Sequence, residues 1–260
     1  MDLEIAGIIF PAFIAGLIVL LTHVPLGREV IQRGIIFIDL AVAQIAGLGV
    51  LVAYQFGWDM HGLHAQFAAV MSALIAAVIM NALECRAGKH MEAYIGVIFV
   101  LAATASILLL ANNPHGSEHL KELLVGQILW VDWHQITLAA VVSLLVVIVW
   151  FALKEKMGNI GFYVLFALSI TISVQLIGVY LVFTSLIVPA LATVRYSEKT
   201  ALFVAAIIGV SGYLSGLVLS AMLDLPSGAV IVWCLVGSAM LVSLVLSKVS
   251  LNVLKAQEKH

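Results

Sequence analysis

The sequence has very little charge. Of its 260 residues, 10% are Asp, Glu, Lys or Arg, whereas 63% are hydrophobic and the mean hydropathy is +1.18. A water-soluble domain has about a quarter of its residues charged, so the composition excludes that class and predicts an integral membrane protein. The net charge of −2 provides no basic footprint for nucleic acid.

Cysteine is also scarce. Cys85 and Cys234 lie in or at the end of different apolar segments, and neither belongs to a CxxC motif or a zinc-finger spacing. We interpret both as packing residues within the membrane. The N-terminus has Asp2 and Glu4 where a secretory signal would have Lys or Arg, so the first apolar segment is expected to be a retained helix.

Long apolar segments dominate the rest of the chain. Because a helix needs about 20 apolar residues to cross a bilayer, we expect about nine spans, with a break near Gly178 that divides residues 161–194 into two short helices. The predicted fold is an all-α polytopic membrane bundle that forms a single transmembrane domain over residues 1–260. The expected spans are 3–22, 34–55, 66–84, 93–111, 129–153, 160–176, 177–194, 201–222 and 227–248.

The cations predict the orientation, because loops rich in Lys and Arg stay in the cytoplasm. With the N-terminus outside and the C-terminus in the cytoplasm, every Lys and Arg except Lys121 lies on the inner side. This partition supports an odd number of spans.

The expected outer loops contain candidate metal ligands. Imidazole and carboxylate groups are ligands that divalent transition metals prefer, so these loops are candidates for receiving Zn²⁺ or a similar ion. The alternative is that they are ordinary polar residues at a membrane interface. The candidates are His61, His64, His115, Glu118 and His119.

Asp39 is the carboxylate that lies well inside an expected span. An ionisable group there costs at least a few kcal/mol unless it is paired or faces an aqueous cavity, which favours a role in a translocation pathway. The alternative is a structural role, in which Asp39 bonds neighbouring hydroxyls or a cation that reaches in from the cytoplasmic edge. Other polar residues that are candidates for the same pathway are Gln44, Ser173 and Gln175.

Several segments resemble one family of transport proteins. They are VIQRGIIFIDLAVAQIAGLGV, MEAYIGVIFVLAATASILLL, HLKELLVGQILWVDWHQITL, and QLIGVYLVFTSLIVPALATVR followed by LDLPSGAVIVW. Together they resemble the permease subunit of ABC importers for zinc, manganese or iron, over nearly the whole chain. The pairing of GVYLVFTSLIVPALAT with LPSGAVIV is the most specific part.

The resemblance implies a homodimeric permease of the bacterial plasma membrane and not an enzyme. It would receive a divalent metal from an extracytoplasmic binding protein and be driven by a separate ATPase. The chain has no GxxxxGK[ST] phosphate loop, which agrees with an ATPase on another chain. By resemblance, residues 189–199 form a short coupling helix that docks on the ATPase, with Pro189, Arg195, Glu198 and Lys199 as its key residues. Zinc is the favoured cargo, with manganese and iron as alternatives.

The second expected span departs from the family pattern. Family members typically have an Asp followed four residues later by a His, whereas Asp39 is followed by Ala43 at that spacing and by Gln44 one residue later. At about 100° per residue, Asp39 and Gln44 lie roughly 140° apart on a helix, so an unbroken helix does not direct both side chains at one ion. Without this histidine, either this subfamily passes the ion along a looser polar path or its substrate is not the bare ion that the family name suggests.

Two rival functions remain open on the sequence. A secondary transporter driven by an ion gradient would predict internal repeats with paired broken helices, and we find one plausible break. The segment from His115 to His119 fits the HxxEH pattern of inverted zinc proteases. It follows a loop that ends at Pro114, whereas that motif requires a helix.

Overall fold

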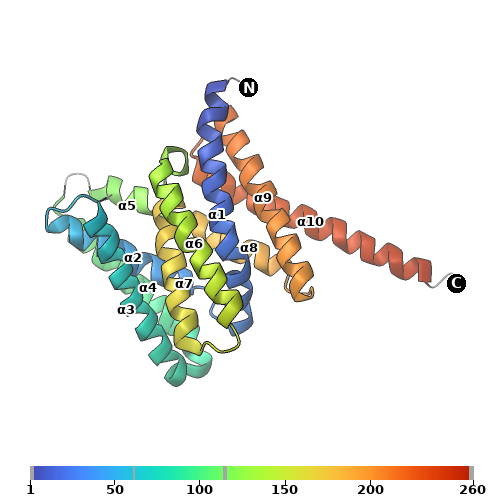
Figure 1. The fold of residues 1–260 in the computed structure, drawn as a ribbon, viewed down its shortest axis with the longest axis horizontal. Coiled ribbons are helices and arrows are strands. Elements are labelled where there is room, and N and C mark those ends of the chain that lie inside the picture. The colour runs from blue at the N-terminus through green and yellow to red at the C-terminus, as the bar shows by residue number, and fades with distance from the viewer. Residues whose placement is uncertain (1–2, 61, 114–115, 258–260) are drawn as a thin grey trace.

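The computed structural model describes residues 3–257 except 61, 114 and 115, and for residues 3–6, 122 and 247–257 it describes the backbone only. The described residues form helices and contain no strand. The α-helices are α1 (Leu3–Arg33), α2 (Ile38–Gln55), α3 (Leu63–Ala87), α4 (Met91–Leu110), α5 (Gly116–Val125), α6 (Trp133–Leu153), α7 (Asn159–Ile177), α8 (Val179–Ala192), α9 (Glu198–Leu223) and α10 (Ser227–Gln257), shown in Figure 1. Two short 3-10 helices, η1 (Gly88–His90) and η2 (Ile128–Trp130), precede α4 and α6.

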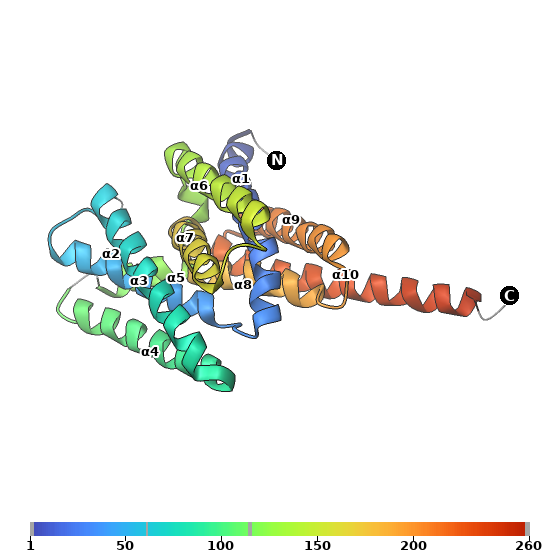
Figure 2. The ribbon, with the colours of Figure 1, turned by 60° about the horizontal axis from the view of Figure 1, so that its bottom comes forward.

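Seven continuous helical segments of the described chain are long and apolar enough to cross a membrane. One of them, Leu63–Leu110, contains both α3 and α4, which meet at η1 (Figure 2). When α3 and α4 are taken separately and the short apolar helix α8 is included, the helices correspond to the nine expected spans. The expectation of an all-α polytopic membrane bundle is therefore confirmed.

Two segments differ from the expected spans. The first helix does not end near residue 22 but continues through Pro25 to Arg33, because Val24, Leu26 and Val30 extend its buried face. A helix tolerates an internal proline where neighbouring helices surround it. The second difference is α5, which forms where the sequence predicted an outer loop.

The amphipathic pattern of α5 explains why it forms. Leu120, Leu123 and Leu124 recur at helical spacing and line a cavity, whereas Glu118 and Lys121 are exposed. The helix is only ten residues long, so its stability depends on packing against its neighbours. It contacts α4, α7 and α8.

The expected break at Gly178 is confirmed. Gly178 ends α7 and begins α8 with φ +77° and ψ 164°, a conformation that is essentially restricted to glycine. The connection after α5 crosses this break at Gly126, which also has a positive φ of +72°. The two backbones lie so close that a Cβ atom on Gly178 would be 2.7 Å from the Gly126 Cα.

The centre of the bundle is formed by α1, α7 and α8. Helix α1 packs against α6, α8 and α9, whereas α7 packs against α2, α3 and α6. Phe162, Tyr163 and Phe166 of α7 are almost completely buried. By contrast, only 17% of the apolar window of α10 and 22% of the α3–α4 window are buried, so the apolar faces of these helices point outward, as contact with lipid requires.

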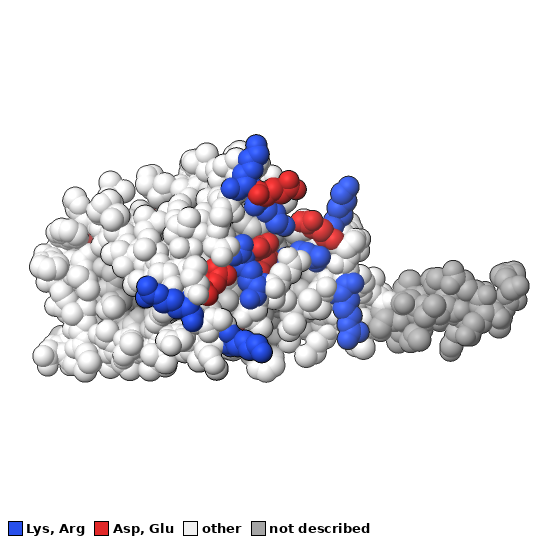
Figure 3. All heavy atoms as spheres, turned by 90° about the horizontal axis from the view of Figure 1, so that it is seen from below, with Lys and Arg blue, Asp and Glu red and all other residues white. Residues whose placement is uncertain are grey.

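Eight Lys and Arg side chains gather at one end of the bundle, whereas Lys121 on α5 lies apart from them. They lie at the end of α1, at the α3–α4 turn, at the α6–α7 turn and around the α8–α9 turn, which Figure 1 shows at the lower side. Figure 3 shows that face from below, with Lys and Arg side chains and acidic side chains among them. The described residues concerned are Arg28, Arg33, Arg86, Lys89, Lys154, Lys156, Arg195 and Lys199.

Candidate functional site

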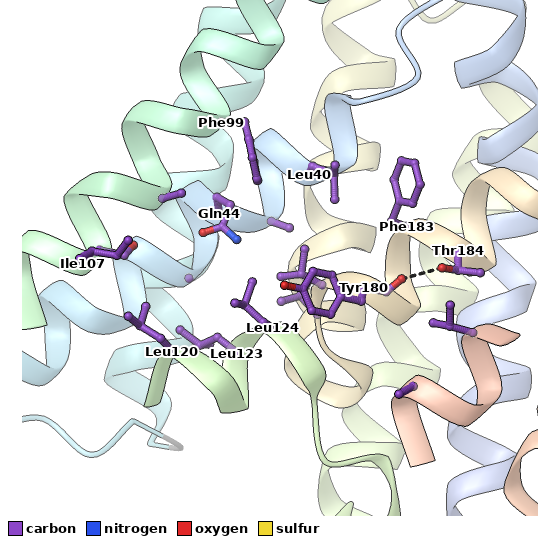
Figure 4. A pocket seen from close by; sticks show the side chains of 18 of the residues that line it. Leu40, Gln44, Phe99, Ile107, Leu120, Leu123, Leu124, Tyr180, Phe183 and Thr184 are labelled. Carbon is purple, nitrogen blue, oxygen red and sulfur yellow. Dashed lines mark hydrogen bonds between the residues drawn. The ribbon is translucent and has the colours of Figure 1, made fainter. Parts of the chain in front are cut away.

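A cavity of about 570 Å³ lies between α2, α4, α5, α7, α8 and α10. Figure 4 shows Gln44 of α2 among the apolar side chains that line this cavity. Its amide makes no hydrogen bond to the described residues, whereas the Thr184 hydroxyl donates to the Tyr180 carbonyl oxygen at 2.8 Å. The Ser106 hydroxyl donates to the Ala102 carbonyl oxygen at 3.0 Å. The Gln44 amide is therefore a polar group in the cavity that makes no hydrogen bond to the described residues.

Asp39 lies on a different face of α2 and does not line this cavity. It is 1% exposed, and among the described residues neither carboxylate oxygen has a side-chain hydrogen-bond partner. Asp39 is in the first turn of α2, where the partial positive charge of a helix N-terminus favours a carboxylate. The Glu92 carboxylate is close enough to interact with it electrostatically. The structure thus separates Asp39 from Gln44.

A second cavity of about 310 Å³ lies where α3 and α6 begin and α7 ends, at the opposite end of these helices from the α3–α4 and α6–α7 turns. Gln175 lines it, and three further amide side chains from other segments do so as well. Leu123 and Val174 line both cavities, so these two side chains lie between them. Ser173 is buried on α7 and lines neither cavity. The three further amides are Gln66, Gln127 and Gln135.

The candidate outer ligands are spread over two segments. His64 is exposed and its ring lies 5.2 Å from the Trp58 ring, whereas the His119 ring lies 5.1 Å from Tyr54, in an edge-on contact. Glu118 is exposed on α5. The described part of the chain has no group of three or more His, Cys, Asp and Glu side chains placed to hold a metal ion. His61 and His115 lie outside the described residues, so a metal site in these loops stays a prediction.

The predicted coupling segment has a different local structure from the one the resemblance implied. Pro189 is buried in the last turns of α8, residues 193–197 form a turn, and Glu198 and Lys199 begin α9. We call residues 193–197 the docking turn. The separate short helix is thus absent from this described segment, because α8 and α9 occupy its two ends. Arg195 and Lys199 are exposed, and the Glu198 carboxylate pairs with the Lys154 ammonium at 3.2 Å.

Sequence reasoning missed the contribution of α5 and of the amides around the second cavity. The leucine spacing in HLKELL is the signal that predicts an amphipathic helix. No such signal exists for Gln66, Gln127 and Gln135, because they reach one cavity from three separate segments.

The fold is a polytopic α-helical membrane bundle with polar groups in its cavities. The chain belongs to the ABC 3 transport family, whose model matches residues 6–162 and 151–247. This family is one of transport proteins.

Similar proteins confirm the resemblance to permeases of metal ABC importers. One is the "Probable metal transport system membrane protein" of Chlamydia trachomatis, 23% identical over 93% of this chain and 89% of that protein. Another is the "High-affinity zinc uptake system membrane protein ZnuB" of Haemophilus influenzae, 24% identical over 87% of this chain and 93% of that protein. A solved structure, "PsaBC from Streptococcus pneumoniae in complex with Fab", has the same fold, with a TM-score of 0.73, 20% identity and coverage of 93% and 95% of the two chains.

Proposed function

We propose that this chain is the permease subunit of an ATP-binding-cassette importer that moves a divalent transition metal ion, zinc first, into the cytoplasm. The match of the family model to nearly the whole chain supports this proposal most strongly. The absence of a phosphate loop from the sequence is consistent with ATP hydrolysis on a separate subunit.

The translocation pathway in this proposal includes both cavities. The ion passes the amide-rich cavity at Gln175, then the constriction at Leu123 and Val174, and then the cavity at Gln44. Amide oxygens provide weak ligands, which suits a path that must release its ion. Asp39 is the remaining carboxylate candidate on the same helix as Gln44, and Ser173 lines the path only after a rearrangement of α7.

A second copy of the chain completes the larger cavity. Trp233 and Tyr180 line this cavity and are 79% and 53% exposed, so the chain by itself leaves the cavity open at these side chains. A homodimer would cover these aromatic side chains and enclose the path between two protomers.

The cation-rich face is the cytoplasmic side in this proposal, with the N-terminus outside. The ATPase contacts the docking turn on this face, together with Glu198 and Lys199, whereas the buried Pro189 shapes the end of α8 that leads into the turn. Arg195 is exposed in the turn and is available to an acidic groove of the ATPase.

The opposite face receives the metal from an extracytoplasmic binding protein. The residues proposed to take part are His61, His64, His115, Glu118 and His119. Zinc is favoured because imidazole is one of its usual ligands and because one similar protein is named as a zinc uptake permease.

Affinity purification of the tagged chain tests the mechanism. We expect it to recover a P-loop ATPase and to form a complex with two copies of the chain. A stable chain that transports metal without an ATPase would refute the importer proposal in favour of a gradient-driven transporter.

Uptake into proteoliposomes tests the cargo. Complexes reconstituted with the metal-loaded binding protein should accumulate zinc in the presence of ATP, with manganese and iron accumulating more slowly. A higher rate for manganese or iron would reject zinc as the cargo while leaving the importer mechanism in place.

A further inference from the structure

Lys154 connects three segments at the cation-rich face. It lies at the end of α6, and its Nζ is 3.2 Å from Glu198 Oε1 at the start of α9. The same Nζ is 3.8 Å from Glu29 Oε2 near the end of α1. The lysine therefore joins the helix that follows the docking turn to α1, which is more than 150 residues away in the sequence.

The network continues from Glu29 into the end of α1. Arg33 Nε donates to Glu29 Oε1 at 2.8 Å, and these side chains are 21% and 14% exposed. The Arg33 guanidinium also contacts Glu84 of α3 at 3.8 Å and donates to Asn159 Oδ1 of α7 at 3.2 Å. Its Cζ lies 4.2 Å from the centre of the Phe162 ring. This part of the network is packed between helices and partly shielded from water.

Arg33 is the last residue before the turn that leads into α2. The Ile36 N–H in this turn donates to the Glu92 carboxylate of α4. The Phe37 ring is stacked on Phe183 of α8, with centroids 6.1 Å apart and planes inclined by 6°. Asp39 follows in the first turn of α2. A displacement of the end of α1 would therefore move the start of the helix that positions both Asp39 and Gln44.

The two halves of the network differ in strength. Lys154 and Glu198 are 37% and 57% exposed, and exposed pairs of this kind are weak and easily broken. The Glu29 and Arg33 side chains are less exposed, and their paired atoms are closer together, at 2.8 Å. Helix α1 also contacts the docking turn directly, because Arg28 Nη2 donates to the Tyr196 carbonyl oxygen at 3.2 Å.

We propose that Lys154 is a positioning residue that transmits movement of the docking turn to the α1–α2 turn, through Glu198 on one side and Glu29 on the other. The inference rests on the proposed function, because it assigns the docking turn to the ATPase. Movement of the turn shifts Glu198, Lys154 follows, and its pull on Glu29 displaces the end of α1. In this view the exposed Lys154–Glu198 pair strengthens and weakens during the transport cycle, while the shielded pair keeps Glu29 attached to Arg33 at the end of α1.

The test measures zinc ions imported per ATP hydrolysed by the full complex in proteoliposomes, with zinc supplied on its binding protein. Lys154→Met keeps most of the side chain's length but removes the charge. It should assemble with the ATPase and hydrolyse ATP, but import roughly fivefold less zinc per ATP. Lys154→Arg should restore the ratio. Lys156→Met is the matched control, because Lys156 is exposed in the same turn and has no ion pair with the described residues.

Glu29→Gln provides an independent check, since it removes the other end of the same link. It should lower the ratio by a similar factor, and the double variant with Lys154→Met should be no worse than either single variant. If the wild-type complex imports zinc with ATP hydrolysis and Lys154→Met imports as many zinc ions per ATP, this inference is wrong, whereas the proposed function is unaffected. An equal loss of hydrolysis and import through failed assembly, not restored by Lys154→Arg, also overturns it. A wild-type chain that recruits no ATPase overturns the proposed function and this inference with it.

Discussion

Replacing Gly178 with alanine tests the crossing that joins the broken helix α7–α8 to the connection after α5. Gly178 has φ +77° and ψ 164°, and a residue with a side chain pays about 1–3 kcal/mol to adopt such a conformation. The new Cβ would also lie 2.6 Å from the Val125 carbonyl carbon and 2.7 Å from the Gly126 Cα. These are backbone atoms, so no side-chain rotation relieves the contact.

The magnitude follows from these two effects. Carbon atoms pack at about 3.5–4.0 Å, so the connection after α5 must move by about 1 Å, and overpacking of this kind costs about 1–3 kcal/mol. We expect Gly178→Ala to lower the free energy of unfolding by about 3 kcal/mol in total. For a chain of this size that corresponds to a melting temperature lower by roughly 6–12 °C.

Thermal unfolding in detergent, followed by the loss of monodisperse protein, measures this effect. Gly237→Ala is the matched control: nothing lies within 4 Å of its new Cβ and Gly237 is inside α10, so a helix-favouring alanine should leave stability equal or slightly higher. Gly126→Ala should resemble Gly178→Ala, and combining the two should cost less than their sum, because they disturb one contact. A melting temperature for Gly178→Ala equal to that of the wild type would refute the close crossing.

Three further predictions concern the pathway and its scaffold. Asp39→Ala should abolish metal uptake while the complex with the ATPase still assembles. If less complex assembles and the complex that does assemble transports at the normal rate, Asp39 has a structural role instead. Leu123→Trp should fill the space between the two cavities beside Val174 and block uptake without preventing ATPase binding, and transport at the wild-type rate would remove this constriction from the pathway. Tyr213→Phe removes the buried hydrogen bond of 2.8 Å to Ser185, and because the Ser185 hydroxyl keeps its bond to a carbonyl oxygen of its own helix, we expect a loss of only about 0.5–1.5 kcal/mol in a thermal unfolding assay.

The ion-pair network and the cavities explain why much of the site could not be predicted from the sequence. Lys154, Glu29 and Glu198 belong to three helices, and nothing in their local sequence indicates that their charges meet. The two cavities likewise depend on α5, whose ten residues become a stable helix only where α4, α7 and α8 pack against it. Contacts of this kind are set by how whole helices pack.

The sequence by itself determined the class of protein and the approximate positions of its apolar helices. Apolar segments of spanning length must form helices, because a bilayer provides no partners for free backbone groups. Gly178 likewise determined the break, and helix periodicity placed Asp39 and Gln44 on different faces of α2. The tertiary structure decided which of these faces meets a cavity, how far α1 extends, and that Lys154 joins the start of α9 to α1 near its end. These features depend on side chains that are distant in sequence, and only the packing of the helices brings them together.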